Sequence, residues 1–245
     1  EVTKLTPSGK IGVLREIFTN LEARHVQVYL HNEDIQKSVS QLSWSGEVFT
    51  PTCPGNCYTD FYGIVEANVG VNKANYFVER SQSLETKLES GKVSNTLTLE
   101  LTNNANPSLG EAGRYKSYVR VLIPEDAELG EIYNVSGQSL TTITPEIYPT
   151  KGRKEVGFLV EVLGEQSQKI IVNWNNKINL DFNKPGEYRL YVRKQAGTMD
   201  EDKFSLDLTL PIWKINMAPK LTLTKEGSFS YTTTLARDFF SRISW

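Results

Sequence analysis

Reactive side chains are scarce in this sequence. Its 245 residues include two cysteines, two histidines and two methionines. Two cysteines cannot supply the four ligands of a structural zinc site, and His25 and His31 lie well upstream of them without metal-type spacing. We therefore expect no structural zinc and no bound cofactor.

A surplus of positive charge is also missing. Lys and Arg number 27 against 29 Asp and Glu, a formal charge of -2, so the composition offers no excess to neutralise a phosphate backbone. No uninterrupted apolar run approaches the roughly 18 residues of a membrane-spanning helix. We expect neither a nucleic-acid partner nor a membrane span within this chain.

Helical periodicity is confined to the first part of the chain. Thr6 and Pro7 suit an N-cap and first turn, and Asn32 can cap a second helix. Between the two helices, residues 25–30 alternate with period two, which predicts a strand. The apolar faces of the two helices would be Ile11, Leu14, Ile17 or Phe18, and Leu21, and then Ile35, Val39 and Leu42. The order helix, strand, helix predicts the tail of an α/β layer.

From Trp44 onward, short alternating or β-branched runs separated by Gly, Asn and Pro predict strands. The polar run 103–110 is the expected boundary. The prediction is a mainly β protein: residues 1–105 as the C-terminal part of an α/β domain with a β-extension, and residues 106–245 as an antiparallel, immunoglobulin-like β-sandwich. The expected strands are 61–66, 76–84, 93–101, 118–123, 157–163, 169–174, 187–193 and 204–210, with weaker ones around Leu221 and at 229–234.

The two cysteines lie in the phrase Thr52-Cys53-Pro54-Gly55-Asn56-Cys57. Pro presets one backbone angle of a turn and Gly permits a positive one, so the loop can fold back and bring both thiols together. We predict a local disulfide between Cys53 and Cys57. Such a bond persists outside the reducing cytosol, which predicts an exported protein.

Several phrases together resemble one family of bacterial envelope proteins, domain-of-unknown-function family four-thousand-and-twelve. They are His25 to Leu30, the Trp44-Ser45-Gly46 turn, Glu66-Ala67-Asn68-Val69-Gly70-Val71-Asn72-Lys73-Ala74-Asn75-Tyr76, Tyr115 to Pro124 and Val192 to Thr198. The resemblance covers about residues 20 to 210. Ser45 stands where an acidic residue is expected, and the loop from Cys53 to Cys57 departs from the family pattern.

The resemblance implies an outward-facing protein on a membrane anchor, whose larger N-terminal part is similar to phosphotransferases that attach polymers to Gram-positive walls. The chain begins at Glu1 without a Met or a secretion signal, so we expect a mature or excised form, with any anchor upstream. The implied location is extracytoplasmic, at the cell surface. The family carries no established functional residues to transfer.

Candidate catalytic groups are few. His25 and His31 are the available imidazole bases, and both suit structural positions at the two ends of the expected strand. The acidic clusters are Glu125-Asp126 with Glu128, and Asp200-Glu201-Asp202; solvated loop charge explains both. A calcium site at Asp200, Glu201 and Asp202 is the functional alternative.

The phrase 68–75 gathers three amides and an ammonium around a glycine. Asn68, Asn72, Lys73 and Asn75 are a candidate polar site, although Asn also favours turns because its side chain bonds the local backbone. Exposed Trp residues could stack on sugars; the candidates are Trp44, Trp174, Trp213 and Trp245, of which Trp174 suits the core better.

Three functions remain open. The leading one is a non-catalytic structural or interaction module of a cell-envelope protein, with an envelope polymer or a protein as partner. The second is the C-terminal fragment of a wall-polymer phosphotransferase whose active site lies upstream. The third is a carbohydrate-binding or adhesive sandwich, which requires exposed aromatic residues in a row.

Overall fold

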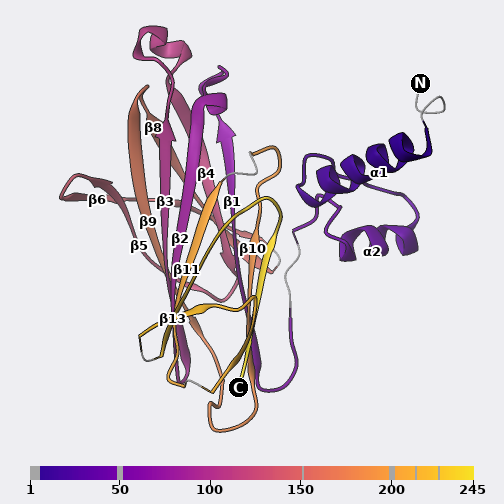
Figure 1. Cartoon of the computed structure of the whole chain (residues 1–245). Coiled ribbons are helices and arrows are strands. Elements are labelled where there is room, and N and C mark those ends of the chain that lie inside the picture. Colours follow the sequence, from indigo (N-terminus) through magenta and orange to yellow (C-terminus); the bar gives the residue numbers. More distant parts are fainter. Residues whose placement is uncertain (1–5, 49–51, 151, 199–201, 213, 226) are drawn as a thin grey trace.

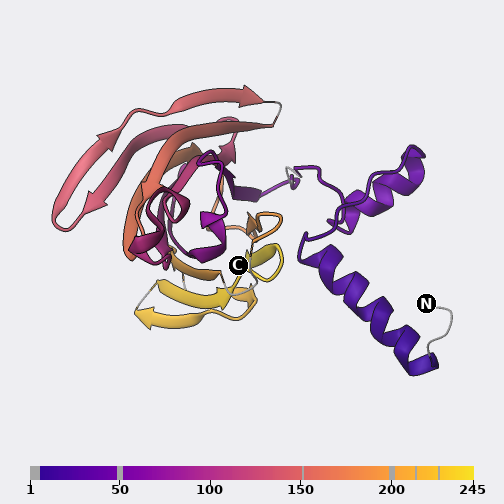
Figure 2. The ribbon, with the colours of Figure 1, turned by 90° about the horizontal axis from the view of Figure 1, so that it is seen from above.

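The computed structural model describes residues 6–48, 52–150, 152–198, 202–212, 214–225 and 227–245. Within these ranges, fifteen strands form two sheets that pack face to face, and two α-helices lie outside them (Figure 1). Figure 2 shows the sheets as layers with the helices to one side. The predicted mainly β fold with a β-sandwich is confirmed.

The first sheet has seven strands in the order β12-β15-β10-β1-β4-β8-β7. Their bounds are β12 Asn216–Ala218, β15 Phe239–Ser244, β10 Glu187–Arg193, β1 Cys57–Asn68, β4 Tyr115–Pro124, β8 Arg153–Val162 and β7 Glu146–Thr150. The second sheet has eight strands in the order β13-β14-β11-β2-β3-β9-β5-β6. Their bounds are β13 Thr222–Lys225, β14 Ser228–Thr234, β11 Lys203–Thr209, β2 Val78–Glu89, β3 Lys92–Asn103, β9 Gln166–Lys177, β5 Glu128–Ser136 and β6 Ser139–Ile143.

Both sheets are mixed, which corrects the prediction of a purely antiparallel sandwich. β1 pairs in parallel with β10, Cys57 opposite Glu187, and β2 pairs in parallel with β11, Ser81 opposite Lys203. Each of these pairs joins the first part of the chain to the last. The sheets therefore cross the predicted boundary at residue 105, and the sandwich begins at β1.

The hairpin of β2 and β3 shows why these residues form strands. Side chains alternate between buried and solvent-facing positions along both strands, and Leu84 and Leu97 face each other in the core. The turn contains Gly91 at φ 83°, a left-handed conformation that glycine adopts without strain. Period-two alternation predicted the two strands, at 76–84 and 93–101, because one face is buried and the other is hydrated; β2 extends further, to Glu89.

Polar bonds cross the core between the sheets from β1. The Asp60 carboxylate accepts a hydrogen bond from Asn95 Nδ2 at 2.7 Å, and the Tyr62 hydroxyl bonds to Gln82 Oε1 at 3.1 Å. Asp60 also accepts bonds from its neighbour's backbone N–H and from the Tyr188 hydroxyl. Burial raises the pKa of Asp60 to about 6, against the lowering effect of these bonds.

The two helices form an arm outside the sandwich. The arm comprises α1 Pro7–Glu22, capped by Thr6, and α2 Glu33–Gln41, capped by Asn32, as the capping residues predicted. Neither described helix is long and apolar enough to cross a membrane.

The predicted strand at 25–30 and the α/β layer are wrong. Residues 25–30 lie in coil: Val28 N–H bonds to the Trp44 carbonyl at 2.9 Å and Leu30 N–H to Gln36 Oε1 at 2.8 Å, but none of the strands in the described ranges runs beside them. Alternation without a partner strand does not make a sheet.

A buried ion pair fastens the arm to the sandwich. Arg24, 2 % exposed, follows α1 with φ 60° and donates from Nε and Nη2 to both oxygens of Asp238, at 2.8 and 2.6 Å. Asp238 also accepts from the Tyr191 hydroxyl and the Lys194 backbone N–H, and Arg24 Nη1 donates to the Ser45 carbonyl. Burial lowers the pKa of Arg24, but Asp238 raises it further, so the net shift is upward and the charge is retained.

Cys53 and Cys57 form a disulfide, with Cα atoms 5.7 Å apart, as the sequence predicted. Gly55 between them has φ 75°. The bond closes the loop that leads into β1.

We predict that Arg24→Met releases the arm. The substitution leaves Asp238 partly buried without its cation, and breaking a buried pair costs about 3–5 kcal/mol. Limited proteolysis should then cleave residues 25–48 at least tenfold faster than in the original chain. Arg237→Ala is the matched control, because Arg237 pairs with Glu22 of the arm at the surface, where ion pairs contribute little. Equal cleavage of both variants would contradict the role of Arg24.

A second prediction concerns pH. Because the folded pKa of Asp60 lies above the unfolded value of 3.8, the folded state binds its proton more tightly, and stability falls as pH rises from about 4 to about 6. The loss is on the order of 3 kcal/mol. Urea unfolding across this range should show it, and Asp60→Asn, which keeps the volume but does not titrate, should remove the part of the slope that Asp60 contributes. Asp202, whose pKa burial also raises to about 6, contributes a slope of the same sign that should remain. An unchanged slope would contradict the assignment.

Candidate functional site

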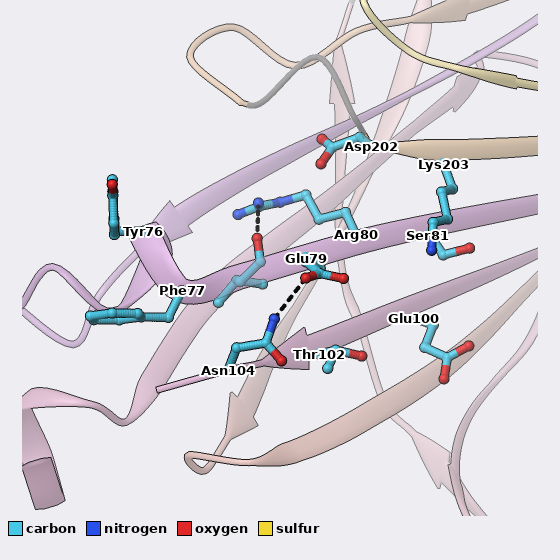
Figure 3. A pocket seen from close by; sticks show the side chains of 11 residues that line it. Tyr76, Phe77, Glu79, Arg80, Ser81, Glu100, Thr102, Asn104, Asp202 and Lys203 are labelled. Atoms are coloured by element: carbon cyan, nitrogen blue, oxygen red, sulfur yellow. Dashed lines mark hydrogen bonds between the residues drawn. The ribbon is translucent and has the colours of Figure 1, made fainter. Parts of the chain in front are cut away.

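A cleft of about 730 Å³ opens at the end of the sandwich that carries the 3₁₀ helix η2 Ala74–Phe77, the top in Figure 1. We call it the end cleft. Figure 3 shows Tyr76 and Phe77 at one end of it, Lys203 and Glu100 at the other, and Arg80 and Asp202 between them. Its lining residues are Tyr76, Phe77, Val78, Glu79, Arg80, Ser81, Glu100, Thr102, Asn104, Asp202 and Lys203.

Arg80, one of the residues that line the end cleft, belongs to a buried ion pair that joins the two sheets. Arg80 of β2 donates from Nε to Glu66 of β1 at 2.7 Å, and their side chains are only 7 % and 3 % exposed. Arg80 Nη1 also donates to the Val78 carbonyl at 2.9 Å, and the Tyr115 hydroxyl donates to the other Glu66 oxygen. Burial lowers the pKa of Arg80, but Glu66 more than offsets this, so the guanidinium stays charged.

Asp202, the residue before β11, is the second buried charge of the end cleft. It is 6 % exposed, and burial raises its pKa to about 6, although the charges of Arg80 and Lys194 and a hydrogen bond with Thr198 act in the opposite direction. At neutral pH Asp202 is therefore mostly ionised in a poorly hydrated position. A ligand group that donates hydrogen bonds would stabilise this carboxylate.

The rim carries an aromatic pair and further polar groups. The rings of Tyr76 and Phe77 lie 5.6 Å apart at 90°, and Tyr76 is 73 % exposed. Glu79 accepts a hydrogen bond from Asn104 Nδ2 at 2.9 Å. The rim thus offers an open ring beside hydrogen-bond donors and acceptors.

The predicted polar site lies next to the end cleft. Asn68, Asn72 and Asn75 line a second cleft of about 400 Å³ that shares Tyr76 and Arg80 with the first. Their amides are largely engaged: Asn68 Nδ2 bonds to the Asn72 carbonyl at 2.8 Å and to Asn75 Oδ1 at 3.1 Å, and Asn72 Nδ2 bonds to the Arg114 carbonyl at 2.8 Å. These bonds build a turn, while Lys73 is exposed and is not among the lining residues.

The structure separates the other candidate residues. Asp200 and Glu201 of the candidate calcium site lie outside the described residues, and the charge of Arg80 acts on Asp202. No group of three His, Cys, Asp or Glu within the described ranges has metal-site geometry. Both histidines belong to the arm, His31 with its ring 5.4 Å from that of Tyr29.

The Trp residues do not form an open row in the part of the chain that is described. Trp174 is buried in the core, as predicted. Trp44 packs on Phe18 with ring centres 5.4 Å apart, Trp245 packs on Phe182 at 5.0 Å, and Trp213 lies outside the described residues.

Sequence reasoning missed Glu66, Arg80 and Tyr115 as members of one cluster. The signal available in the sequence was the alternation of side chains along β2. Arg80 occupies the same face of this strand as Leu84 and Leu88, so its side chain points inward. A charge at an inward position requires a buried partner. The partner itself lies on another sheet, which the pattern does not identify.

No protein-family model matches the chain, and no curated protein sequence is detectably similar to it. Among solved structures, a candidate nutrient binding protein from Legionella pneumophila is similar with a TM-score of 0.46 and 8% identity, over 75% of this chain and 70% of that one. Yeast LTA4 hydrolase follows with a TM-score of 0.41 and 8% identity, over 69% of this chain and 29% of that one. An M1 zinc metallopeptidase from Deinococcus radiodurans has a TM-score of 0.30 and 10% identity, over 69% and 42%. Likeness at this level leaves the function open.

We predict strong coupling between Glu66 and Arg80. Glu66→Leu leaves Arg80 buried without its anion and should cost about 3–5 kcal/mol of unfolding free energy, whereas Glu66→Leu combined with Arg80→Met should recover most of it. Urea unfolding of both variants measures the difference. Glu128→Ala, which breaks the exposed pair with Lys177, should leave the midpoint nearly unchanged. Additive losses in the double variant would refute the coupling.

Proposed function

We propose that the chain is an extracytoplasmic, non-catalytic interaction module of a bacterial cell-envelope protein, and that the end cleft is its binding site. The observation that carries the proposal is the cleft itself: Arg80, one of its lining residues, is held by Glu66 of the other sheet, which also accepts a bond from Tyr115. Binding sites are concave and largely preformed, with a few polar groups that orient the ligand.

The bonding of the polar groups favours binding over catalysis. Glu66 already accepts bonds from Arg80 and Tyr115, so it is held as a structural anion. Both cysteines form the disulfide, and both histidines belong to the arm. A nucleophile needs an adjacent base within hydrogen-bond reach. The cysteines, which could act as nucleophiles, are joined to each other, and the histidines, which could act as bases, lie in the arm and away from the end cleft.

Two features support the proposed location. The disulfide between Cys53 and Cys57 suits an oxidising compartment. The resemblance to the envelope family favours a location at the cell surface, with a membrane anchor upstream. It also favours an envelope polymer as the partner. The immunoglobulin-like topology stays a prediction, since each sheet contains a parallel pair.

The second candidate function is the C-terminal fragment of a wall-polymer phosphotransferase whose catalytic residues lie upstream. In that case the sandwich supports the enzyme or presents its polymer. The two functions differ in what the chain does alone: the interaction module binds polymer through the end cleft, whereas a supporting fragment needs no such binding.

Sedimentation with purified envelope wall material tests the proposal. The chain should sediment with the wall, and Ser81→Trp, which fills the end cleft without changing a charge, should reduce the bound fraction several-fold. Thr222→Trp, at an exposed position of β13, is the control and should bind normally. No sedimentation, or equal sedimentation of both variants, would refute the end cleft as the binding site.

A further inference from the structure

The end cleft combines an open aromatic ring with closely spaced hydrogen-bonding groups. Tyr76 is the most exposed ring beside the cleft, and its contact with Phe77 restrains it. Next to it lie the Glu79 carboxylate and the Asn104 amide, already bonded to each other. A pyranose ring has a weakly apolar C–H face and a periphery of hydroxyl groups, so it needs an aromatic surface and planar polar side chains of this kind.

The charged residues that line the end cleft indicate which charge its ligand carries. Three carboxylates line the end cleft, Glu79, Glu100 and Asp202, against two cations, Arg80 and Lys203. Glu66 pairs with Arg80, and Lys169 pairs with Glu100 at 3.7 Å. Among the lining charges, Glu79 and Asp202 then stand against Lys203. This small negative excess opposes a phosphate-rich or uronic polymer and favours a ligand that is neutral or positively charged.

Resting on the proposed function, we infer that the ligand of the end cleft is a neutral or amine-bearing oligosaccharide rather than an anionic polymer. One sugar stacks on Tyr76, and its hydroxyl or amino groups donate hydrogen bonds to Asp202 and its neighbours. An ammonium group on the sugar binds more tightly than a neutral substituent, because Asp202 is buried and ionised near neutral pH.

Calorimetric titration of the whole chain with three probes tests this. The probes are an N-acetylated chito-oligosaccharide, its deacetylated, amine-bearing counterpart of equal length, and polyphosphate. At slightly acidic pH and low salt, where the sugar amine is protonated and Asp202 is still largely ionised, the amine-bearing sugar should bind several-fold more tightly than the acetylated one, and polyphosphate should not bind.

Two variants separate stacking from charge. Tyr76→Ala should weaken both sugars about fivefold while leaving the preference for the amine intact. Asp202→Asn should remove that preference while leaving the acetylated sugar nearly unaffected. Tyr29→Ala is the matched control, since Tyr29 is 74 % exposed but belongs to the arm; it should change nothing.

The outcomes test the sugar ligand separately from the proposed binding role of the end cleft. Binding of polyphosphate, or sugar binding that Tyr76→Ala does not weaken, refutes the inference. If no sugar probe binds while the chain still sediments with wall material in a manner sensitive to Ser81→Trp, the ligand class is wrong and the binding module stands. If sedimentation also fails, both are wrong.

Discussion

The ion pair between Glu66 and Arg80 is the constraint on which the end cleft depends. It joins β1 of one sheet to β2 of the other, and Tyr115 of β4 completes it. Two further polar bonds leave β1 for the second sheet, Asp60 to Asn95 and Tyr62 to Gln82. An apolar core alone tolerates sliding of one sheet over the other, whereas directional bonds at three levels of a single strand favour one relative position of the sheets. Arg80, which lines the end cleft, is held in place by that alignment.

The arm is likewise held to the sandwich by a buried ion pair, between Arg24 and Asp238. Its helices expose many apolar side chains, including Ile11, Leu14 and Ile35, and its firmest attachment to the sandwich is the polar group around Arg24 and Asp238. Arg24 holds a left-handed backbone conformation that costs a non-glycine residue some free energy, and the two-fold hydrogen bond to Asp238 offsets it. The orientation of the arm is thus set by a few charged groups, and packing contributes less to it.

Local pattern predicted the helices and most of the buried strands, because their side chains face one protein surface with a fixed period. β6 and β7 were missed because almost all of their side chains are exposed, so no alternation marks them. β15 was also missed, although its side chains alternate between buried and exposed positions. The polar run at 103–110 indicated a domain boundary, but it is a connection at the sandwich end: Asn103 is buried and donates to the carbonyls of Gly113 and Val162. The site was missed for a related reason, since Glu66, Arg80 and Asp202 come from distant segments and meet only through strand pairing across the whole chain.

The two parallel pairs have a consequence for synthesis on the ribosome. β1 borders β4 and β10, and β2 borders β3 and β11. A nascent chain that ends before Glu187 can form the neighbouring hairpins, but it leaves one side of β1 and one side of β2 with unpaired backbone groups. Closing these edges requires contacts between segments far apart in sequence, which are slow to form. Until β10 and β11 emerge, the unfinished sandwich presents two long strand edges on which other chains can pair, so the last quarter of the sequence protects the first half from aggregation.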